Sequence, residues 1–235
     1  MNLILLFPED YTGTATVRLS GRRLKHVMEI HRAGVGDQLS VGLLDGLMGR
    51  GLVTKLDEEA LEMVVSLDLP PPPKLPLTLL LALPRPKVLN RALASAASLG
   101  VARIVLLNAW KVEKAYWKSP KLDQETLHQQ LILGLEQAKD TALPELKIAR
   151  LFRPYVEDEL PVLAKDHLLL VGHPGAPDAC PRALEGPSVL AIGPEGGWVE
   201  KELESLRQTG FQAVDLGPRI LRVETALAAL VGRLY

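Results

Sequence analysis

A seven-residue stretch at positions 192–198, Ile-Gly-Pro-Glu-Gly-Gly-Trp, has a composition suited to holding a ligand. Glycine lacks a Cβ atom, so three glycines beside a proline define a tight turn whose main chain a ligand can approach closely. The spacing differs from the GxGxxG of dinucleotide-binding proteins, and no Gly-Lys-Ser/Thr follows to make a P-loop. A plain turn is the alternative, but it would need fewer glycines. The composition therefore favours a binding loop.

A second stretch, positions 216–226, reads Leu-Gly-Pro-Arg-Ile-Leu-Arg-Val-Glu-Thr-Ala and sets charged and hydroxyl side chains before an apolar run. Glu224 and Thr225 suit the capping of a helix, with Arg219 and Arg222 solvated. The same groups beside a helix amino terminus also suit the binding of a ligand. Taken alone, this stretch favours the capping interpretation slightly and leaves ligand binding as the alternative.

Both stretches fall in a region whose hydrophobic pattern alternates between strands and helices. Continuous apolar runs predict buried strands, and the segments between them predict helices. Such alternation indicates a parallel α/β sheet, and α/β proteins bind ligands at the carboxyl ends of the strands. The expected strands are residues 77–83, 102–107, 167–171 and 188–192, and the expected helices are residues 87–99, 123–140, 200–208 and 224–234.

The first 69 residues follow a different pattern. Short, nearly alternating apolar segments at 37–41 and 61–65 predict strands, Asp45-Gly46 predicts a hairpin turn, and residues 21–31 predict a short helix. Four consecutive prolines then open residues 70–76, which excludes a helix and favours an extended spacer. We therefore expect a β-rich domain over 1–69, a proline-rich linker over 70–76 and an α/β domain over 77–235.

Taken together, these segments resemble one known family. Gly193-Pro194-Glu195-Gly196-Gly197, followed by positions 216–226, is similar to the RsmE family of ribosomal RNA uridine-N3 methyltransferases, which belongs to the SPOUT superfamily. The resemblance covers essentially the whole chain, and its carboxy-terminal part is the most specific. The other matching pieces are residues 26–27, 36–37, 45–46, 97–101, 136–137, 143–145 and 173–174.

The resemblance implies a fold, an activity and partners. The activity is S-adenosyl-L-methionine-dependent methylation of a uridine N3 in small-subunit ribosomal RNA. The fold is a small PUA-like β-barrel that binds RNA, followed by a parallel-sheet SPOUT methyltransferase domain with a carboxy-terminal trefoil knot. The partners are ribosomal RNA or the small ribosomal subunit, and a second copy of the chain in a homodimer whose active site lies at or near the subunit interface.

Transferred residue by residue, the resemblance assigns the cofactor to three loops, at 170–174, 192–197 and 216–221, with a contribution from the last helix. The predicted cofactor-binding residues are Leu170, Gly172, His173, Pro174, Ile192, Gly193, Pro194, Gly196, Gly197, Leu216, Gly217, Ile220, Leu221 and Thr225.

The expected chemistry singles out three charged residues. Attack by uracil N3 on a sulfonium methyl requires loss of a weakly acidic proton, and the negative charge on the ring needs a cation or an oriented donor. Arg222 is the candidate, and Glu224 or Glu195 would orient it or relay the proton. Structural salt bridges are the alternative. No metal is expected, because no cluster of His, Cys and Asp has ligand spacing.

Local charge, unlike the formal net charge of −1, points to RNA. A basic run near the amino terminus would neutralise phosphates, and lysines interleaved with Tyr116 and Trp117 would let bases stack. Solvated surface charge is the alternative. The predicted RNA-binding residues are Arg18, Arg22, Arg23, Lys25, Arg32, Lys111 and Lys114.

Composition also bears on location. A single cysteine, Cys180, excludes an intramolecular disulfide and fits a reducing compartment. The apolar start is short, has no charged leader and continues into Glu9 and Asp10, so it indicates a strand and not a signal peptide. No apolar run approaches the length of a membrane span. We expect a cytoplasmic protein without a membrane partner.

The chain departs from the family pattern at several positions. Ser98 stands where the family has glutamate, Asp140 where it has arginine, and Val199 where it has a helix-capping serine, and residues 108–111 differ as well. The cofactor loops match, whereas the segments expected to face RNA diverge. Two alternatives therefore stay open: a SPOUT methyltransferase with a different RNA target, and a non-catalytic RNA-binding or ribosome-assembly factor that retains the fold.

Overall fold

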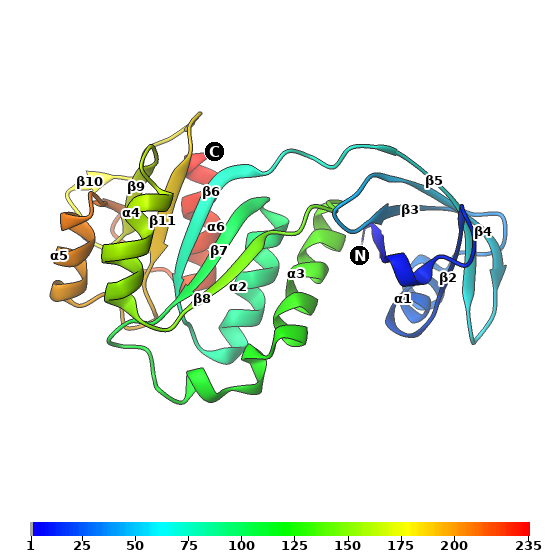
Figure 1. Cartoon of the computed structure of the whole chain (residues 1–235), viewed down its shortest axis with the longest axis horizontal. Coiled ribbons are helices and arrows are strands. Elements are labelled where there is room, and N and C mark those ends of the chain that lie inside the picture. Colours follow the sequence, from blue (N-terminus) through cyan, green and yellow to red (C-terminus); the bar gives the residue numbers. More distant parts are fainter. Residues whose placement is uncertain (1) are drawn as a thin grey trace. The chain divides into compact units, whose positions relative to one another are not determined.

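The computed structural model describes residues 2–235, which form two compact units. The first comprises the described residues through Pro73 together with Ile132–Leu143. The second comprises Lys74–Leu131 and Pro144–Tyr235. The chain thus enters the second unit, returns to the first for a short segment, and completes the second (Figure 1).

The first unit is built on a five-stranded sheet in the order β1-β3-β4-β5-β2. β1 pairs with β3 in parallel, and the other neighbours are antiparallel. As predicted, a tight turn at Asp45 joins β3 to β4, and Asp45 adopts the left-handed conformation (φ 56°) that aspartate tolerates. The strands are β1 (Ile4–Leu6), β2 (Thr16–Leu19), β3 (Gln38–Leu43), β4 (Met48–Leu56) and β5 (Leu61–Leu69).

Alternating side chains of these strands form one core. In β5, Leu61, Met63 and Val65 are buried, whereas Val64 between them is exposed, as the sequence pattern predicts. Leu24 and Val27 contribute to the same core from α1 (Gly21–His26) and the π-helical Val27–His31 that continues it. All five strands therefore face a shared interior.

The segment Ile132–Leu143 packs on the first unit through main-chain hydrogen bonds. The carbonyl oxygen of Glu136 accepts from the N–H groups of Asn2 and Leu3, at 2.9 and 3.0 Å. The N–H of Asp45 donates to the carbonyl of Thr141 at 2.8 Å. The domain boundaries expected from the sequence placed this segment in the α/β domain. Helical periodicity predicts a helix but does not show which of two sheets the end of that helix packs against.

The second unit contains a seven-stranded sheet in the order β10-β12-β9-β11-β6-β7-β8, and every neighbouring pair is parallel. The parallel α/β architecture expected from the sequence is thereby confirmed. The strands are β6 (Leu75–Ala82), β7 (Val101–Leu107), β8 (Glu145–Ala149), β9 (Leu168–Gly172), β10 (Asp178–Ala179), β11 (Ser188–Ile192) and β12 (Gln212–Asp215).

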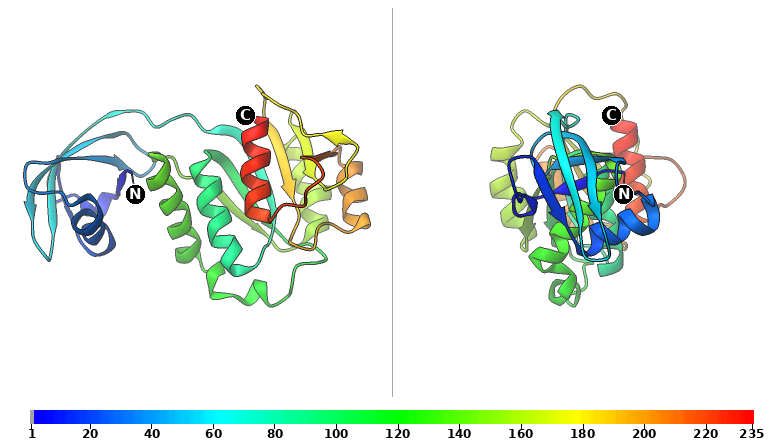
Figure 2. Two further views of the ribbon diagram at one scale, coloured as in Figure 1. Left: turned by 180° about the vertical axis from the view of Figure 1, so that it is seen from behind. Right: turned by 90° about the vertical axis from the view of Figure 1, so that its right-hand side faces the viewer.

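Helices cover both faces of this sheet. α2 packs against α6 on one face, and α4 lies on the other (Figures 1 and 2). The four strands and four helices predicted for this region are present, each with bounds within two residues of those expected. The helices are α2 (Pro86–Ser98), α3 (Gln124–Ala138), α4 (Leu160–Leu163), α5 (Glu200–Gln208) and α6 (Val223–Leu234), with 3-10 turns at Pro8–Asp10, Tyr116–Lys118 and Pro120–Leu122 and a π-helical turn at Pro154–Glu159.

Within residues 2–235, no helix combines the length and apolar character needed to cross a bilayer. The same residues contain no grouping of three or more His, Cys, Asp or Glu side chains arranged to hold a metal ion.

Candidate active site

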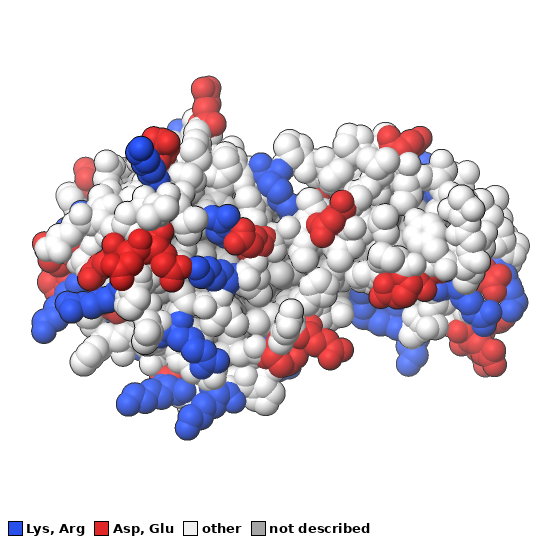
Figure 3. Space-filling view, viewed as in Figure 1, with Lys and Arg blue, Asp and Glu red and all other residues white. Residues whose placement is uncertain are grey.

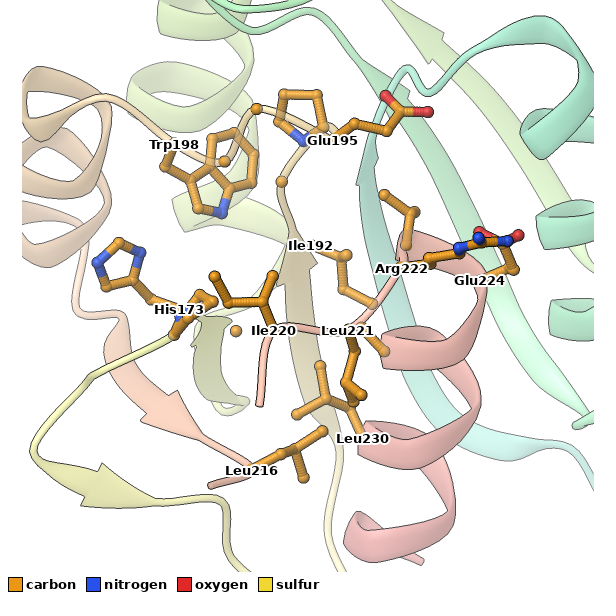
Figure 4. A pocket seen from close by; sticks show the side chains of 18 of the residues that line it. His173, Ile192, Glu195, Trp198, Leu216, Ile220, Leu221, Arg222, Glu224 and Leu230 are labelled. Atoms are coloured by element: carbon orange, nitrogen blue, oxygen red, sulfur yellow. The ribbon is translucent and has the colours of Figure 1, made fainter. Parts of the chain in front are cut away.

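A cavity of about 820 Å³ opens in the second unit at the carboxyl edge of the parallel sheet. It lies where the loops after β6, β7, β9, β11 and β12 meet the start of α6 (Figure 4). The strand order reverses here, since the chain runs from β6 to β7 and β8 on one side and places β11, β9 and β12 on the other. Parallel sheets bind ligands at such switch points, and the volume suits a cofactor-sized molecule.

Most of the predicted cofactor residues line this cavity. The exceptions are Leu170, which is buried inside β9, Gly217, which is not part of the lining, and Thr225, which is exposed on the first turn of α6. The predicted residues that line it are Gly172, His173, Pro174, Ile192, Gly193, Pro194, Gly196, Gly197, Leu216, Ile220 and Leu221, together with Glu195, Arg222 and Glu224.

The glycine-rich loop after β11 wraps around a tryptophan that sequence reasoning did not assign to the site. A Cβ atom at Gly193 would lie 3.2–3.3 Å from the indole of Trp198, so this glycine permits the close packing of loop and ring. Trp198 is buried, and its Nε1 has no hydrogen-bond partner among residues 2–235. A buried N–H donor without a partner, in a cavity wall, is suited to a ligand acceptor.

The opposite part of the cavity is apolar. Figure 4 shows the side chains of Ile192, Leu216, Leu221 and Leu230 grouped near β11 and α6. An adenosyl group offers flat apolar faces and ring acceptors, which match these walls and the free indole N–H. The residues present therefore fit the cofactor that the sequence resemblance implies.

Asp215 joins two of the cavity loops, a role that the sequence patterns did not indicate. Its Oδ2 accepts from the N–H of Gly175 at 3.0 Å, and its Oδ1 accepts from the N–H groups of Leu216 and Gly217 at 2.7 and 3.2 Å. Burial opposes ionisation of Asp215, but these N–H donors and the nearby His173 outweigh it, so the pKa of the carboxyl lies below its usual value.

The three predicted catalytic residues differ in their partners. The carboxylate of Glu195 accepts from the N–H of Arg85 at 3.0 Å, and that of Glu224 pairs with Arg91 at 2.9 Å. The guanidinium of Arg222 is exposed and has no ion pair or hydrogen bond within residues 2–235. A salt bridge between Arg222 and Glu224, the alternative drawn from the sequence, is not formed, because Arg91 from α2 occupies the carboxylate.

Lys111, predicted to contact RNA, lies in the cavity lining. Its Nζ donates to the carbonyl oxygen of Gly196 at 2.7 Å, which links the loop after β7 to the loop after β11. Arg85 and Arg91, which follow the carboxyl end of β6, were missed as cavity residues although they stand at the same sheet edge. With Arg219 and Arg222 they give the rim a concentration of positive charge.

A buried glutamate supports the same loops. Val199, at the start of α5, has no side-chain acceptor, as the sequence indicated, but its N–H donates to Glu202 Oε2 at 3.0 Å. The other oxygen, Oε1, accepts from the N–H of Trp110 at 2.7 Å. Glu202 therefore satisfies the N–H of Val199 and fixes the loop after β7 to α5, but the side-chain acceptor that a capping serine would supply to the first turn is still absent.

In the first unit, three of the arginines predicted to bind RNA are held in ion pairs. Arg23 makes two hydrogen bonds to Asp10, at 2.5 and 2.6 Å, and both side chains are largely buried. Arg22 makes two to the buried carboxylate of Glu136, at 2.8 and 2.9 Å, and Arg18 pairs with Glu62 at 3.4 Å. The other predicted RNA-binding side chains, Lys25, Arg32 and Lys114, are exposed.

The only cysteine is not a catalytic thiol. Cys180 is buried, and burial raises the pKa of its thiol despite the proximity of Arg233. A neutral, inaccessible thiol is a poor nucleophile.

Known proteins are similar to this chain in both sequence and fold. Residues 71–235 match the RNA methyltransferase domain family. The chain is 32% identical to the ribosomal RNA small subunit methyltransferase E of Treponema pallidum, over 97% of this chain and 88% of that protein. It is 26% identical to the ribosomal RNA small subunit methyltransferase E 1 of Borreliella burgdorferi, over 97% and 95% of the two chains.

Solved structures agree. A protein from Legionella pneumophila, solved in complex with the bound cofactor S-adenosylmethionine, superimposes with a TM-score of 0.75 at 25% identity, covering 98% of this chain and 96% of that one. A ribosomal RNA small subunit methyltransferase E from Neisseria gonorrhoeae shows the same fold, with a TM-score of 0.73 at 23% identity over 98% and 95% of the two chains. With a family match over residues 71–235 and full-length similarity to named relatives, this chain belongs to the ribosomal RNA small subunit methyltransferase E family of RNA methyltransferases.

Proposed function

We propose that the protein transfers the methyl group of S-adenosylmethionine to N3 of a uridine in small-subunit ribosomal RNA. The family assignment supports the reaction class: the chain is an S-adenosylmethionine-dependent ribosomal RNA methyltransferase. The observation that carries the finer proposal is the position of Arg222. It lies on the rim of the cofactor cavity with its guanidinium unpaired within residues 2–235, at the point where a target base would meet the methyl group.

Different groups of the cavity would contact different parts of the cofactor. Main-chain groups of the loops at 172–174, 192–197 and 216–221 would contact it, and Trp198 Nε1 would donate to it. Bound there, S-adenosylmethionine supplies an electrophilic methyl group. Ile192, Leu221 and Leu230 exclude water from the apolar part of the cavity, which strengthens electrostatic interactions inside it.

Arg222 then acts on the base. As uracil N3 loses its proton, negative charge spreads over the ring and its carbonyl oxygens, and an adjacent guanidinium stabilises that charge. Arg222 is the residue before α6 (Val223–Leu234), so the amino-terminal end of the helix dipole adds to the positive potential. Glu195 and Glu224 have partners of their own, so we assign them to positioning: Glu195 orients the start of α2, and Glu224 holds Arg91.

We further propose that the first unit is a PUA-like barrel that binds RNA. The shared core of all five strands supports strong curvature of the sheet, although its order leaves β1 and β2 as the terminal strands. This domain consists of the described residues through Pro73 together with Ile132–Leu143, and the methyltransferase domain consists of Lys74–Leu131 and Pro144–Tyr235. The limits expected from the sequence, 1–69, 70–76 and 77–235, differ in that β6 begins at Leu75, within the expected linker. Lys25 and Arg32 are the exposed cations with which this unit would meet phosphate.

A carboxy-terminal trefoil knot is part of the same proposal. β12 pairs with one side of β9, whereas β11 pairs with the other, and α6 packs on α2 and β11. After β12 the chain must therefore cross the β9–β11 region to reach α6. This crossing is the step at which a SPOUT chain passes through its own loop.

We also propose a homodimer formed by the second unit. α6 carries small side chains on a surface that its own unit leaves open, since Ala228 and Gly232 are exposed. They border a shallow hollow with Arg182, Ala183 and Tyr235. Small side chains let another helix approach closely, so this surface suits contact with a second copy of the chain. A monomer in sedimentation at micromolar concentration would contradict the dimer.

Mass spectrometry of ribosomal RNA tests the activity directly. Purified protein, S-adenosylmethionine and small ribosomal subunits from cells lacking the gene should yield N3-methyluridine at one position. The Arg222→Ala variant is the matched control for protein-dependent transfer. A methylated base other than uridine would assign a different RNA target, and calorimetry without cofactor binding would support a non-catalytic RNA-binding factor.

A further inference from the structure

The loop that follows β7 carries a tryptophan whose side chain is almost entirely in water. Trp110 is 82% exposed, although the loop runs along the same sheet edge as the cofactor cavity. Single exposed apolar side chains are common on protein surfaces, so exposure by itself assigns no role. The way in which this loop is held is more informative.

The backbone on both sides of Trp110 is fixed. Ala109 and Val112 are buried, and the N–H of Trp110 donates to the buried carboxylate of Glu202 at 2.7 Å. The same carboxylate accepts from the N–H of Val199, the residue that follows Trp198 of the cavity wall. Trp110 is thus anchored to the cavity wall through its main chain, and only its indole projects into solvent.

The next residue brings the loop into the cavity itself. Lys111 lines the cavity and donates through Nζ to the carbonyl oxygen of Gly196, at 2.7 Å, in the glycine-rich loop. Trp110 therefore directly precedes, in the chain, a residue that lines the cavity. A rigid backbone with a projecting aromatic ring loses little conformational entropy when the ring is covered by a ligand.

The charge around the loop suits a polyanion. Lys114, Lys118 and Lys121 are exposed along residues 108–123, and the guanidinium of Arg150 lies 5.2 Å from the ring centre of Trp117. Lysine and arginine side chains gather along the lower edge of this unit in Figure 3, where that segment runs in Figure 1. The one glutamate in the run, Glu113, is engaged by the hydroxyl of Tyr116.

We infer that Trp110 is a stacking platform for an unpaired base of single-stranded RNA at the mouth of the cavity, an inference that rests on the proposed function. Methyl transfer to uracil N3 needs the Watson–Crick edge of the base to face the cofactor, so the uridine must be unpaired. Unstacking such a nucleotide removes its contacts with neighbouring bases. An aromatic ring beside the cavity replaces them, because either face of the base remains available for stacking.

Replacing the indole separates this role from a structural one. Trp110→Ala should lower kcat/KM for an unpaired uridine-containing oligonucleotide by roughly ten- to a hundredfold. Trp110→Phe keeps an aromatic face and should stay within about threefold of the unmodified protein. Affinity for S-adenosylmethionine, measured by calorimetry, should be the same in all three. Val162→Ala, at an equally exposed apolar residue on α4, is the matched control and should leave kcat/KM unchanged.

Three outcomes decide between explanations. If the unmodified protein transfers no methyl group to uridine, the proposed function fails, and the platform fails with it. If the unmodified protein is active and Trp110→Ala has the same kcat/KM, the proposed function stands and only the stacking role of Trp110 is wrong. If Trp110→Ala sediments with a different mass, the ring contacts another protein chain, and the platform is likewise overturned.

A fluorescence measurement covers the case in which Trp110→Ala does not fold. Trp110 is one of three tryptophans, so stacking by RNA should quench part of the intrinsic emission. In Trp110→Phe that quenching should be largely lost. Equal quenching by RNA in both proteins would overturn the assignment.

Discussion

Three arginines of the first unit, Arg18, Arg22 and Arg23, and one of the cavity rim, Arg222, look alike in the sequence and differ in their partners in the structure. Arg18, Arg22 and Arg23 belong to a basic run, yet each is held by a carboxylate. Arg222 stands two residues before Glu224 in the sequence, yet the Glu224 carboxylate pairs with Arg91. A charge run thus indicates only that cations are present. Whether they can act on a ligand depends on where the carboxylates lie.

The largest expected effect tests the structural half of this comparison. Arg23→Ala leaves the buried carboxylate of Asp10 without its cation, which should lower the free energy of unfolding by about 3–5 kcal/mol. Chemical denaturation would measure the loss. The exposed pair of Arg18 and Glu62 is the control, because Arg18→Ala should cost less than about 1 kcal/mol. Equal losses would mean that Arg23 is no more structural than its neighbour.

The second expectation tests the functional half. Arg222→Ala should lower the single-turnover rate of methyl transfer by about a hundredfold or more, the scale of losing one preorganised electrostatic contact. Cofactor affinity and thermal unfolding should change little, because the guanidinium has no partner within residues 2–235. Arg222→Lys should recover only part of the rate, since an ammonium lacks the planar fork. A stable Arg222→Ala protein with normal turnover would falsify the catalytic role.

Glu224→Gln distinguishes a catalytic role of Arg222 from a structural salt bridge. The substitution removes the partner of Arg91 and not a partner of Arg222, so the rate should fall much less than in Arg222→Ala. Comparable losses in the two variants, accompanied by lower stability, would restore the salt-bridge interpretation.

A smaller effect is expected where a carboxylate holds loops and not a cation. Asp215→Ala removes the acceptor shared by Gly175, Leu216 and Gly217, and should weaken cofactor binding by about tenfold. Because the pKa of Asp215 is lowered in the folded protein, its contribution is fully present above its ordinary value of 3.8 and is lost only as the pH falls through the lower folded value. In calorimetry from pH 5 to 8, the Asp215→Ala protein should therefore bind the cofactor more weakly than the unmodified protein by the same factor at every pH, and a difference that disappears toward pH 5 would contradict the assignment.

The smallest effect belongs to the exposed cations of the first unit. Lys25→Ala and Arg32→Ala should each weaken RNA binding a few-fold, and each should reduce the slope of log affinity against log salt by about 0.7–0.9. Filter binding at several salt concentrations would show it. An unchanged slope in the double variant would move RNA binding away from this part of the unit.

The sequence predicted the elements that periodicity marks and missed those that depend on distant contacts. β11 and α5 were placed to the residue, because a buried central strand and a glycine-closed helix have clear local signals. β8 (Glu145–Ala149) was missed, because it is an edge strand with few buried side chains. The π-helical turn at Pro154–Glu159 was missed as well, because its acidic sequence resembles a loop.

The site divides in the same way. Family-like motifs predicted the loops that line the cavity, including Glu195 and Arg222. Trp198 closes the glycine-rich stretch at 192–198 but was assigned no role of its own, whereas Asp215 and Arg85 enter the cavity because neighbouring strands place their loops together. The position of Arg85 after a parallel strand, at the same edge as the glycine-rich loop, was the one available signal.

The return of the chain to the first unit has a consequence for synthesis on the ribosome. The main-chain partners of Asn2, Leu3 and Asp45 lie in Ile132–Leu143, which emerges after most of α2, β7 and α3 has been made. At about 5–20 residues per second, the roughly 70 residues between Pro73 and Leu143 take on the order of 4–14 s to translate. Throughout that interval, the main-chain N–H groups of Asn2, Leu3 and Asp45 lack these hydrogen-bond partners. A fragment that ends at Pro73 would lack Ile132–Leu143 altogether. An isolated version of the first unit therefore has to include both the residues through Pro73 and Ile132–Leu143.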